Sequence, residues 1–364
     1  MMGIEKGAEN GILYNGGEYI EIASKINTIV FDKTGTLTVG KPSVTDLVTL
    51  TEDIGGDQEL LRPAAIAESG SEHPLAQAII RKAKENGTHI SNPDPFEAMS
   101  GYGLKAVYSN HMIMIGNRML MQNSNISVTK SVDEKLSALE KEGKATVLVS
   151  IDDKISGIIS ILDTLKENAK EAINALKSKR MEVIMITGDN ERTAKAISSK
   201  LGIDRVISQV LPNQKEETIS KLKTEGDKVV AMVGDGIDDT PALSRADLGI
   251  AIGSGTDVVK ETGGIILIKD DIQDVITALD LGKKTISKIK HNLFGAFAYN
   301  TWLIPIAGGA LVPFLGIRVF GWLPIIAGIA MALISVTVVT NSLMLGKYKP
   351  AKTQICQYLF KIIF

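Results

Sequence analysis

Two stretches near the C-terminus contain no charged residue, and they limit the folds that this chain can adopt. They span residues 292–317 and 319–346, and only Arg318 separates them. Each is long enough to cross a hydrocarbon core about 30 Å thick, which needs roughly 20 helical residues. We therefore expect two transmembrane helices over 292–346. The alternative, a buried helical hairpin of a soluble domain, would rarely keep two such runs free of charge.

Lysines flank both stretches and predict how they are oriented. They are Lys283, Lys284, Lys288 and Lys290 before the first stretch, and Lys347, Lys349 and Lys352 after the second. Because positive residues are enriched on the cytoplasmic side of membrane helices, we expect an integral membrane protein with both termini in the cytoplasm. The lipid bilayer is then one of its partners. No cleavable signal peptide is visible at the N-terminus.

Composition excludes several other classes of protein. The net charge of the 364 residues is −2 and the pI is about 6.2, so no basic field attracts nucleic acid. The single cysteine, Cys356, rules out an internal disulfide and a cysteine-only metal site. The length leaves room for two or three domains.

A carboxylate directly behind an apolar run predicts a catalytic site. Ile29-Val30-Phe31 reads as a buried strand, and Asp32-Lys33-Thr34-Gly35-Thr36-Leu37-Thr38 follows it. A strand end fixes the carboxylate, and a glycine-bearing loop offers N–H groups and hydroxyls to phosphate oxygens. A solvated acidic turn would not explain threonines in alternation at 34, 36 and 38. The motif therefore indicates phosphoryl chemistry at Asp32.

The remaining pattern predicts an α/β domain that is interrupted by a second domain. After residue 163, helices at 165–180, 191–201 and 213–225 alternate with strands at 183–186, 206–208 and 229–233, which is typical of a doubly wound parallel sheet. The segment in between carries a helical stretch around 64–85 and two strands at 145–151 and 155–161, which favours an α+β insert. We predict the following ranges: connector, 1–25; α/β domain, 26–40 and 156–271; insert, 41–155; linking helix, 272–291; two membrane helices, 292–346; tail, 347–364.

Three later segments supply what phosphoryl transfer needs. Thr187-Gly188-Asp189 follows the apolar run VIMI, and Asp235 and Asp239 follow VAMV. Carboxylate oxygens are suited to Mg²⁺, and Lys215 offers a cation for the charge that builds on a phosphoryl group. Binding residues are expected where the strands of an open parallel sheet end. The sequence thus predicts that these residues converge on Asp32.

Together, these motifs resemble those of the P-type ATPases, which place an aspartyl-phosphate on a haloacid-dehalogenase-like Rossmannoid domain. DKTGTLT resembles the phosphorylation motif, and TGD, PNQK and GDGIDDTP resemble TGD, PxxK and GDGxNDxP. The resemblance implies that ATP and Mg²⁺ are the cofactors. It implies that Asp32 is the nucleophile and that the phosphate is contacted by Lys33, Thr34, Thr187 and Lys215. Magnesium would be bound by Asp32, Thr34 and Asp235, with support from Asp239. The nucleotide would be contacted by Asp163, Gly188 and Asp189.

Two positions have mechanistic weight. Hydrolytic relatives in the wider superfamily usually carry a second acid two residues after the nucleophile, where this chain has Thr34. Without that acid/base group, hydrolysis of the acyl-phosphate is expected to be slow. Asp238 stands where the family usually has Asn, and a carboxylate adds negative charge beside an anionic site. We expect either a raised pKa at Asp238 or tighter Mg²⁺ binding with slower turnover.

The insert resembles the nucleotide-binding domain of the heavy-metal class of these pumps. The resemblance rests on Ser71-Glu72-His73-Pro74-Leu75 and on Gly101-Tyr102-Gly103. Glu68 can accept a hydrogen bond from the amine of adenine, His73 can stack on or bond to the base, and Gly101 and Gly103 allow close backbone approach. The alternative is that the His-Pro pair only begins a helix.

Polar residues inside the predicted membrane helices suggest the transported ion. They are Tyr299, Asn300, Met331 and Ser335. A thioether favours a soft ion such as Cu(I), and the pattern resembles the copper-transporting branch, although Ile334 replaces one expected serine. Roles in helix packing or bending remain an alternative for the serine and asparagine. The predicted helices carry no carboxylate, which argues against a zinc-like branch.

The resemblance covers nearly the whole chain but only the C-terminal part of such a pump. The Cys-Pro-Cys ion motif, the earlier membrane helices and the actuator domain are absent from this sequence. We expect a catalytic part of a pump for Cu(I) export that needs the missing N-terminal portion as partner. Two alternatives stay open: a membrane-anchored phosphatase of the same superfamily, and a non-catalytic nucleotide-binding subunit of a split pump.

Overall fold

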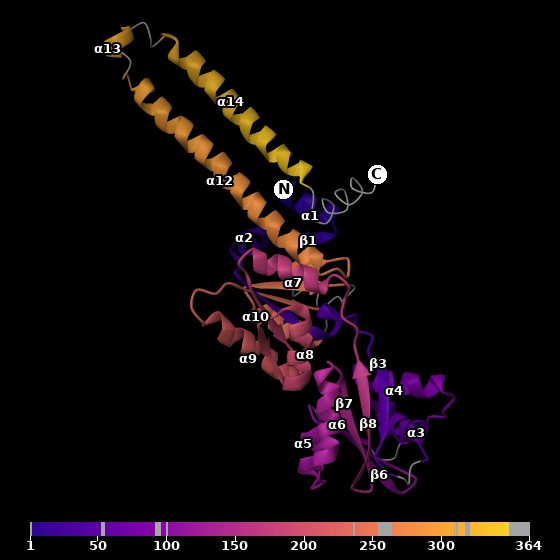
Figure 1. The fold of residues 1–364 in the computed structure, drawn as a ribbon. Coiled ribbons are helices and arrows are strands. Elements are labelled where there is room, and N and C mark those ends of the chain that lie inside the picture. Colours follow the sequence, from indigo (N-terminus) through magenta and orange to yellow (C-terminus); the bar gives the residue numbers. More distant parts are fainter. Residues whose placement is uncertain are drawn as a thin grey trace, which may run out of the picture.

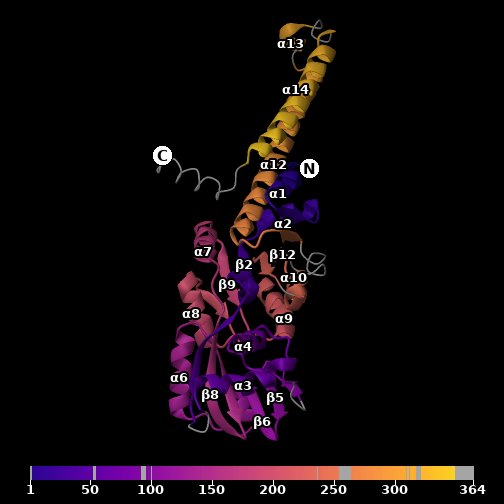
Figure 2. The same cartoon turned by 90° about the vertical axis from the view of Figure 1, so that its right-hand side faces the viewer.

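The molecule is elongated, and its three parts lie in a row. The computed structural model describes residues 2–51, 55–91, 96–99, 101–235, 237–253, 264–308, 310, 312–316 and 321–348. A two-helix hairpin forms one end, an α/β domain lies in the middle, and the inserted domain forms the other end (Figure 1). The view turned by 90° in Figure 2 shows the same order.

The middle domain is built on a seven-stranded sheet in the order β1-β13-β12-β11-β2-β9-β10. Every neighbouring pair is parallel except β1 and β13, which are antiparallel. The strands are β1 (Ile12–Tyr14), β2 (Thr28–Asp32), β9 (Glu182–Ile186), β10 (Arg205–Ile207), β11 (Val230–Gly234), β12 (Leu248–Ile252) and β13 (Ile265–Leu267). The predicted parallel sheet is therefore confirmed, and it places β2 between β11 and β9.

Helices cover both faces of this sheet. They are α1 (Met2–Glu9), α2 (Gly17–Lys25), α7 (Ala169–Ser178), α8 (Glu191–Leu201), α9 (Pro212–Lys223) and α10 (Thr240–Arg245). Because side chains alternate along a strand, Phe31 packs into one hydrophobic core and Val30 into the other. Strand β2 is buried along its whole length, so Asp32 is held by a rigid element.

The inserted domain is a six-stranded antiparallel sheet with helices on both faces. Its strand order is β3-β8-β7-β6-β5-β4. The strands are β3 (Ser43–Thr49), β4 (Phe96–Met99), β5 (Gly103–Tyr108), β6 (His111–Gly116), β7 (Ala145–Ile151) and β8 (Lys154–Leu162). The core under α3 (Asp57–Ala67) and α4 (Pro74–Glu85) lies on one face, and the core under α5 (Arg118–Asn123) and α6 (Lys130–Lys141) lies on the other.

The chain enters and leaves the inserted domain along two adjacent segments. Thr38 pairs with Leu165 as an antiparallel bridge. The N–H of Val39 donates to the carbonyl of Thr164 at 2.8 Å, and the N–H of Lys166 donates to that of Leu37 at 3.0 Å. These two paired segments, the double crossing, connect the two domains.

The structure differs from the sequence prediction in three places. Residues 1–25 are not a mere connector, because α1, β1 and α2 pack on the α/β domain and Tyr14 donates a hydrogen bond to the carbonyl of Ala278 at 2.7 Å. The predicted domain boundary at 155/156 cuts β8, which pairs with β3 and β7 of the insert. The helical stretch around 64–85 is two helices, and the turn Glu68–Gly70 separates them.

The C-terminal hairpin consists of two long helices that lie side by side (Figure 1). Helix α12 (Gln273–Ala307) continues without a break through the predicted linking helix, α13 (Val312–Leu315) lies at the tip, and α14 (Leu323–Leu343) returns. Among the described residues, one helical segment, Gly328–Gly346, is long and apolar enough to cross a membrane. The first predicted span, on α12, does not pass this test within the described residues, so its crossing of a membrane stays a prediction.

The outer surface of the hairpin is apolar. Large hydrophobic side chains that are more than half exposed include Leu293, Phe294, Phe297 and Trp302 on α12, and Ile325, Ile329, Leu333 and Val336 on α14. Exposed apolar surface of this extent marks contact with lipid or with other helices. The predicted tail from residue 349 onward, with Cys356, lies outside the described residues.

Candidate active site

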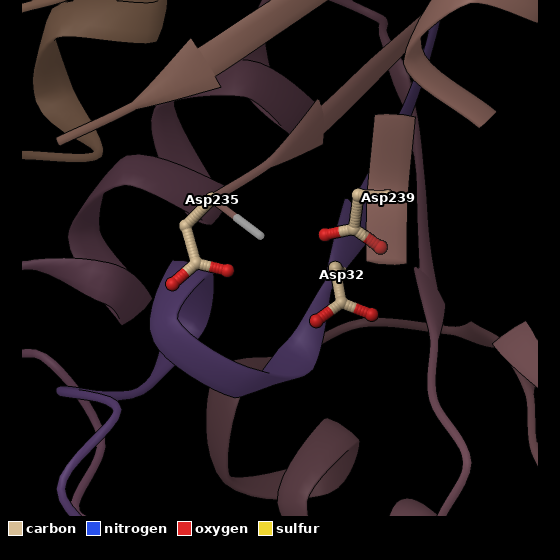
Figure 3. A group of neighbouring side chains, drawn as sticks. All are labelled: Asp32, Asp235 and Asp239. Carbon is tan, nitrogen blue, oxygen red and sulfur yellow. The ribbon is translucent and has the colours of Figure 1, made fainter. Parts of the chain in front are cut away.

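Three carboxylates meet where the central strands end (Figure 3). Asp32 is the last residue of β2, Asp235 directly follows β11, and Asp239 lies in the short turn Ile237–Asp239. One oxygen from each lies within 4.8 Å of the others. Because β2 and β11 are parallel neighbours, their C-terminal ends meet at one edge of the sheet, as the sequence predicts for a binding site.

Lys215 lies between two of these carboxylates. From the first turns of α9, its Nζ donates to Asp32 Oδ1 at 2.7 Å and to Asp239 Oδ1 at 2.6 Å. Burial by itself would lower the pKa of Lys215, but the charges of Asp32 and Asp239 outweigh this effect and raise it. Lys215 is therefore a fixed positive charge in direct contact with the predicted nucleophile.

The carboxylates fit a divalent cation. Burial, and next the charge of Asp32, raise the pKa of Asp235 to about 6 and that of Asp239 to about 7. Two or three hard oxygen ligands in one partly buried place are the chemistry that Mg²⁺ prefers. Lys215 bonds to one oxygen of Asp32 and to one of Asp239, so Asp235 and the other oxygens of these two carboxylates are the candidate ligands. Asp238 is exposed to solvent, and both expectations for it remain predictions.

The loop behind Asp32 is shaped by close contacts. Gly35 has φ +71°, and a Cβ at this position would lie 1.6 Å from Asp235 Oδ2, so only glycine fits. Its N–H donates to the hydroxyl of Thr38 at 3.1 Å, and that hydroxyl donates to Asp163. Thr34 is half-buried in the same loop. The loop thus holds Thr34 next to Asp32 and tightly limits its movement.

A neighbouring loop reaches the same place from β9. Asp32 is in register with Ile186, so Thr187 follows immediately beside Asp32. The hydroxyl of Thr187 accepts the N–H of Asp189 at 3.1 Å, and Lys33 Nζ donates to Asp189 Oδ2 at 2.8 Å. The predicted residues Thr187, Gly188 and Asp189 therefore lie beside the loop that follows Asp32.

Asp163 has a different environment from the one its predicted role suggests. Its Oδ2 accepts the hydroxyl of Thr38, and its Oδ1 accepts the N–H of Lys41 at 3.2 Å. Both partners lie on the outgoing half of the double crossing, whereas Asp163 lies on the returning half. In this structure Asp163 ties the two crossings together, and its role toward nucleotide stays a prediction.

The predicted nucleotide residues come from two connections of the inserted domain. Glu68 begins the turn between α3 and α4, and His73 caps α4, where its Nδ1 accepts the N–H of Leu75 at 3.2 Å. Burial raises the pKa of Glu68 to about 7. Gly101 and Gly103 have φ +78° and +140°, and a Cβ on Gly103 would lie 2.0 Å from the carbonyl oxygen of Ile115. Both glycines are therefore needed by the backbone itself.

These connections face the α/β domain. Desolvation is the largest influence on the pKa of His73 and lowers it. The next largest influences are the charges of Asp238, Lys33 and Asp189, which belong to the other domain. A Cβ on Gly101 would lie 2.3 Å from Leu211 Cδ2, at the start of the helix that carries Lys215. The structure therefore places the predicted adenine side and the predicted phosphate side opposite one another.

The predicted ion residues lie on the two long helices of the hairpin. Asn300 and Ser335 each donate to a carbonyl of their own helix, four residues earlier. Met331 is 70% exposed, and the side chain of Tyr299 lies outside what the structure describes. The soft-ion site stays a prediction.

The sequence reasoning missed three polar residues near the site. Lys166 Nζ donates to the carbonyl of Gly35 at 2.9 Å and pairs with Asp270. Asn117 Nδ2 donates to the carbonyl of Gly101 at 2.9 Å and so supports the glycine turn. Glu140 contacts both domains. Only Lys166 lies near a motif that the sequence analysis used. The partners of Asn117 and Glu140 are far from them in the sequence, so no local pattern predicts these contacts.

Comparison with known proteins gives consistent matches. A family model described as haloacid dehalogenase-like hydrolase matches residues 26–247. A probable copper-exporting P-type ATPase of Archaeoglobus fulgidus is 50% identical over 96% of this chain, and a copper-exporting P-type ATPase of Staphylococcus aureus is 46% identical over the same share. The chain spans only 42% and 41% of the length of these two relatives.

Solved structures agree with these matches. A zinc-transporting PIB-type ATPase in an E2.Pi state aligns with 94% of this chain, at a TM-score of 0.66 and 32% identity, over 54% of its own length. The catalytic domain of the CPx-ATPase CopB-B is also 32% identical, at a TM-score of 0.59. That match covers 77% of this chain and 98% of the domain.

Proposed function

Because this chain belongs to the haloacid dehalogenase-like hydrolases and, within them, to the heavy-metal class of P-type ATPases, we propose that Asp32 takes the γ-phosphoryl group of ATP. The resulting aspartyl-phosphate would drive the export of a soft metal ion, Cu(I), by the longer pump. The observation that carries the proposal is the contact of Asp32 with Lys215, at 2.7 Å, beside Asp235.

The transfer needs few chemical steps from the protein. One carboxylate oxygen of Asp32 forms a bond to the γ-phosphorus while the bond from this phosphorus to the bridging oxygen breaks, and ADP leaves. Lys215 compensates the charge on the phosphoryl oxygens, and Thr187 and Lys33 border the same place. Bound magnesium, held by Asp32 and Asp235, would neutralise further negative charge.

The phosphoenzyme should decay slowly without the rest of the pump. Thr34 lies two residues after the nucleophile and cannot serve as the general acid/base that activates water in hydrolytic relatives. A long-lived acyl-phosphate stores the free energy of ATP for a conformational change. This feature supports an energy-coupling ATPase over a phosphatase.

The inserted domain would hold the adenine end of ATP. Glu68 and His73 offer hydrogen-bonding groups, and the Gly101–Gly103 turn lies close to Leu211 of the α/β domain. Their position opposite Lys33 and Leu211 supports one ATP molecule that bridges the two domains. The catalytic domains would then lie in the cytoplasm, where ATP is available, with the hairpin in the bilayer.

Ion transport is proposed for this chain together with the remaining portion of the pump. The copper assignment rests on Met331 as a soft ligand and on the names of the two curated relatives. Tyr299, Asn300 and Ser335 are the further candidates. In the longer pump, other helices would complete the site around these exposed positions.

Incubation of the purified chain with γ-labelled ATP and Mg²⁺ tests the proposal. We expect an acid-stable, hydroxylamine-sensitive label that is lost in Asp32→Asn. Asp204→Asn is the matched control, because Asp204 is an exposed surface residue paired with Lys177. Rapid release of phosphate from small esters would instead favour a phosphatase, and a complete lack of label would favour a non-catalytic subunit.

A further inference from the structure

A buried carboxylate joins the two catalytic domains. Glu140 lies near the end of α6 in the inserted domain, and its side chain is 1% exposed. Within its own domain it accepts hydrogen bonds from Arg118 Nη1 at 2.5 Å, Arg118 Nη2 at 3.1 Å and Thr146 Oγ1 at 3.2 Å. From the other domain, Asn190 Nδ2 donates at 3.0 Å and Arg192 Nη1 at 3.3 Å. A structural role inside the inserted domain would explain the bonds from Arg118 and Thr146, but it would not explain the bonds from Asn190 and Arg192.

The partners of Glu140 lead to both halves of the active site. Asn190 directly follows Asp189, the partner of Lys33, and its Oδ1 caps α8 by accepting the N–H of Thr193 at 3.0 Å. Arg118 directly follows Asn117, which supports the glycine turn through Gly101. Glu140 is therefore bonded to Asn190, beside the loop that holds Asp189, and to Arg118, beside the residue that supports the glycine turn. The proposed reaction uses both of these segments.

The bonding pattern suits a contact that opens and closes. A buried charge is costly without partners, but when the domains separate Glu140 keeps the paired bonds to Arg118. The bonds from Asn190 and Arg192 exist only when α6 lies against α8. Charge-assisted hydrogen bonds are stronger than neutral ones, so these two bonds favour the closed arrangement without trapping Glu140 unpaired in the open one.

We propose that Glu140 is a positioning residue: it holds the inserted domain closed against the loop at Thr187–Asn190 while ATP donates its phosphoryl group. The proposal rests on the function proposed above. It concerns the delivery of ATP, and the reactivity of Asp32 itself should not depend on it. A small phosphoryl donor such as acetyl phosphate has no adenine for the inserted domain to hold, so its reaction should not need the contact.

Two variants of the full chain remove only the bonds between domains. Asn190→Ser keeps an oxygen that can cap α8 but lacks the amide group that reaches Glu140. Arg192→Ala removes the second donor. Lys195→Ala is the matched control, since Lys195 is a basic residue on the same helix that pairs with Glu191. Each protein is phosphorylated with labelled ATP and, separately, with labelled acetyl phosphate.

We expect the rate with ATP to fall roughly tenfold in Asn190→Ser and in Arg192→Ala, the effect of one charge-assisted hydrogen bond. The rates with acetyl phosphate, and both rates of Lys195→Ala, should stay within about twofold of wild type. In a Glu140→Gln background, Arg192→Ala should have a smaller effect than alone, because the two residues act through one contact.

Two results would overturn the proposal. Unchanged rates with ATP would show that the contact does not matter for delivery, and equal losses with both donors would show that Asn190 and Arg192 only support the phosphorylation loop. These results differ from a failure of the proposed function, in which the wild-type chain accepts no phosphoryl group from either donor.

Discussion

At the scale of single residues, the main feature of the site is that a few lysines balance the negative charge of several carboxylates. Lys215 contacts Asp32 and Asp239 at once, whereas Lys33 is bonded to Asp189 and Lys166 to Asp270. Each lysine therefore has its own task in the described part of the site. Loss of Lys215 leaves two adjacent carboxylates, which would repel both each other and an incoming phosphate.

Lys215→Ala should lower the rate of phosphorylation from ATP by at least about 100-fold, as is typical when a group that stabilises developing charge is removed. Rapid-quench measurement with labelled ATP gives the rate, and a thermal unfolding curve checks that the variant is folded. Lys221→Ala is the matched control, because Lys221 lies on the same helix, is exposed and pairs with Glu217. Equal rates in the two variants would remove Lys215 from the mechanism.

Glu68 should make stability depend on pH. Burial raises its pKa from 4.5 to about 7, so between these values the folded protein binds a proton that the unfolded chain releases. The stability that the protonated Glu68 contributes to the folded protein is fully present below pH 4.5 and is lost as pH rises through about 7. Glu68→Gln, which carries no charge, should therefore raise the Tm relative to wild type by about 2–4 °C at pH 8. At pH 5 the difference should nearly vanish, and a constant difference would contradict the assignment.

At the scale of elements, local patterns predicted most of the α/β domain. The apolar run before Asp32 and the alternation of apolar runs with helical stretches after residue 163 are short-range signals. Strands and helices from 182 to 234 lie close to their predicted ranges. Strand β1 was missed because Ile12-Leu13-Tyr14 is too short to stand out, and its partner β13 is some 250 residues away. The split of α3 from α4 was missed because apolar residues continue through it.

The edge strand β1 should contribute measurably to stability. Ile12 is fully buried and its neighbour Leu13 is 39% exposed. Ile12→Ala should cost about 2–5 kcal/mol by deletion of buried methyl groups, and Leu13→Ala should cost less than about 0.5 kcal/mol. Thermal unfolding of the full chain in detergent compares the two. Similar losses would mean that residues 1–25 are only a connector, as the sequence alone suggested.

At the scale of the whole molecule, the order of the parts indicates how ATP could act on the hairpin. The inserted domain and the hairpin lie at opposite ends of the α/β domain, and α12 runs unbroken from that domain into the apolar region. A continuous helix transmits a change at its base along its length. The sequence motifs located Asp32, Lys215 and Asp235, but not this continuity or the bonds of Glu140, which exist only in the assembled fold.

We expect Thr34 to determine how long the proposed phosphoenzyme lasts before it is hydrolysed. Thr34→Asp introduces a carboxylate two residues after the nucleophile, where it can activate water. We expect the phosphoenzyme of this variant to hydrolyse about 100-fold faster than that of wild type. A chase with unlabelled ATP measures the decay. Thr34→Ser, which keeps the hydroxyl, should decay like wild type, and equal decay in all three proteins would refute this role.

The central claim is tested most directly by locating the phosphoryl group itself. The chain is incubated with Mg²⁺ and γ-labelled ATP, quenched in acid, digested, and mapped by mass spectrometry. The account predicts one labelled peptide that contains Asp32, with the modification on that side chain. A label on any other residue, or no covalent label under conditions in which ATP binds, would contradict it.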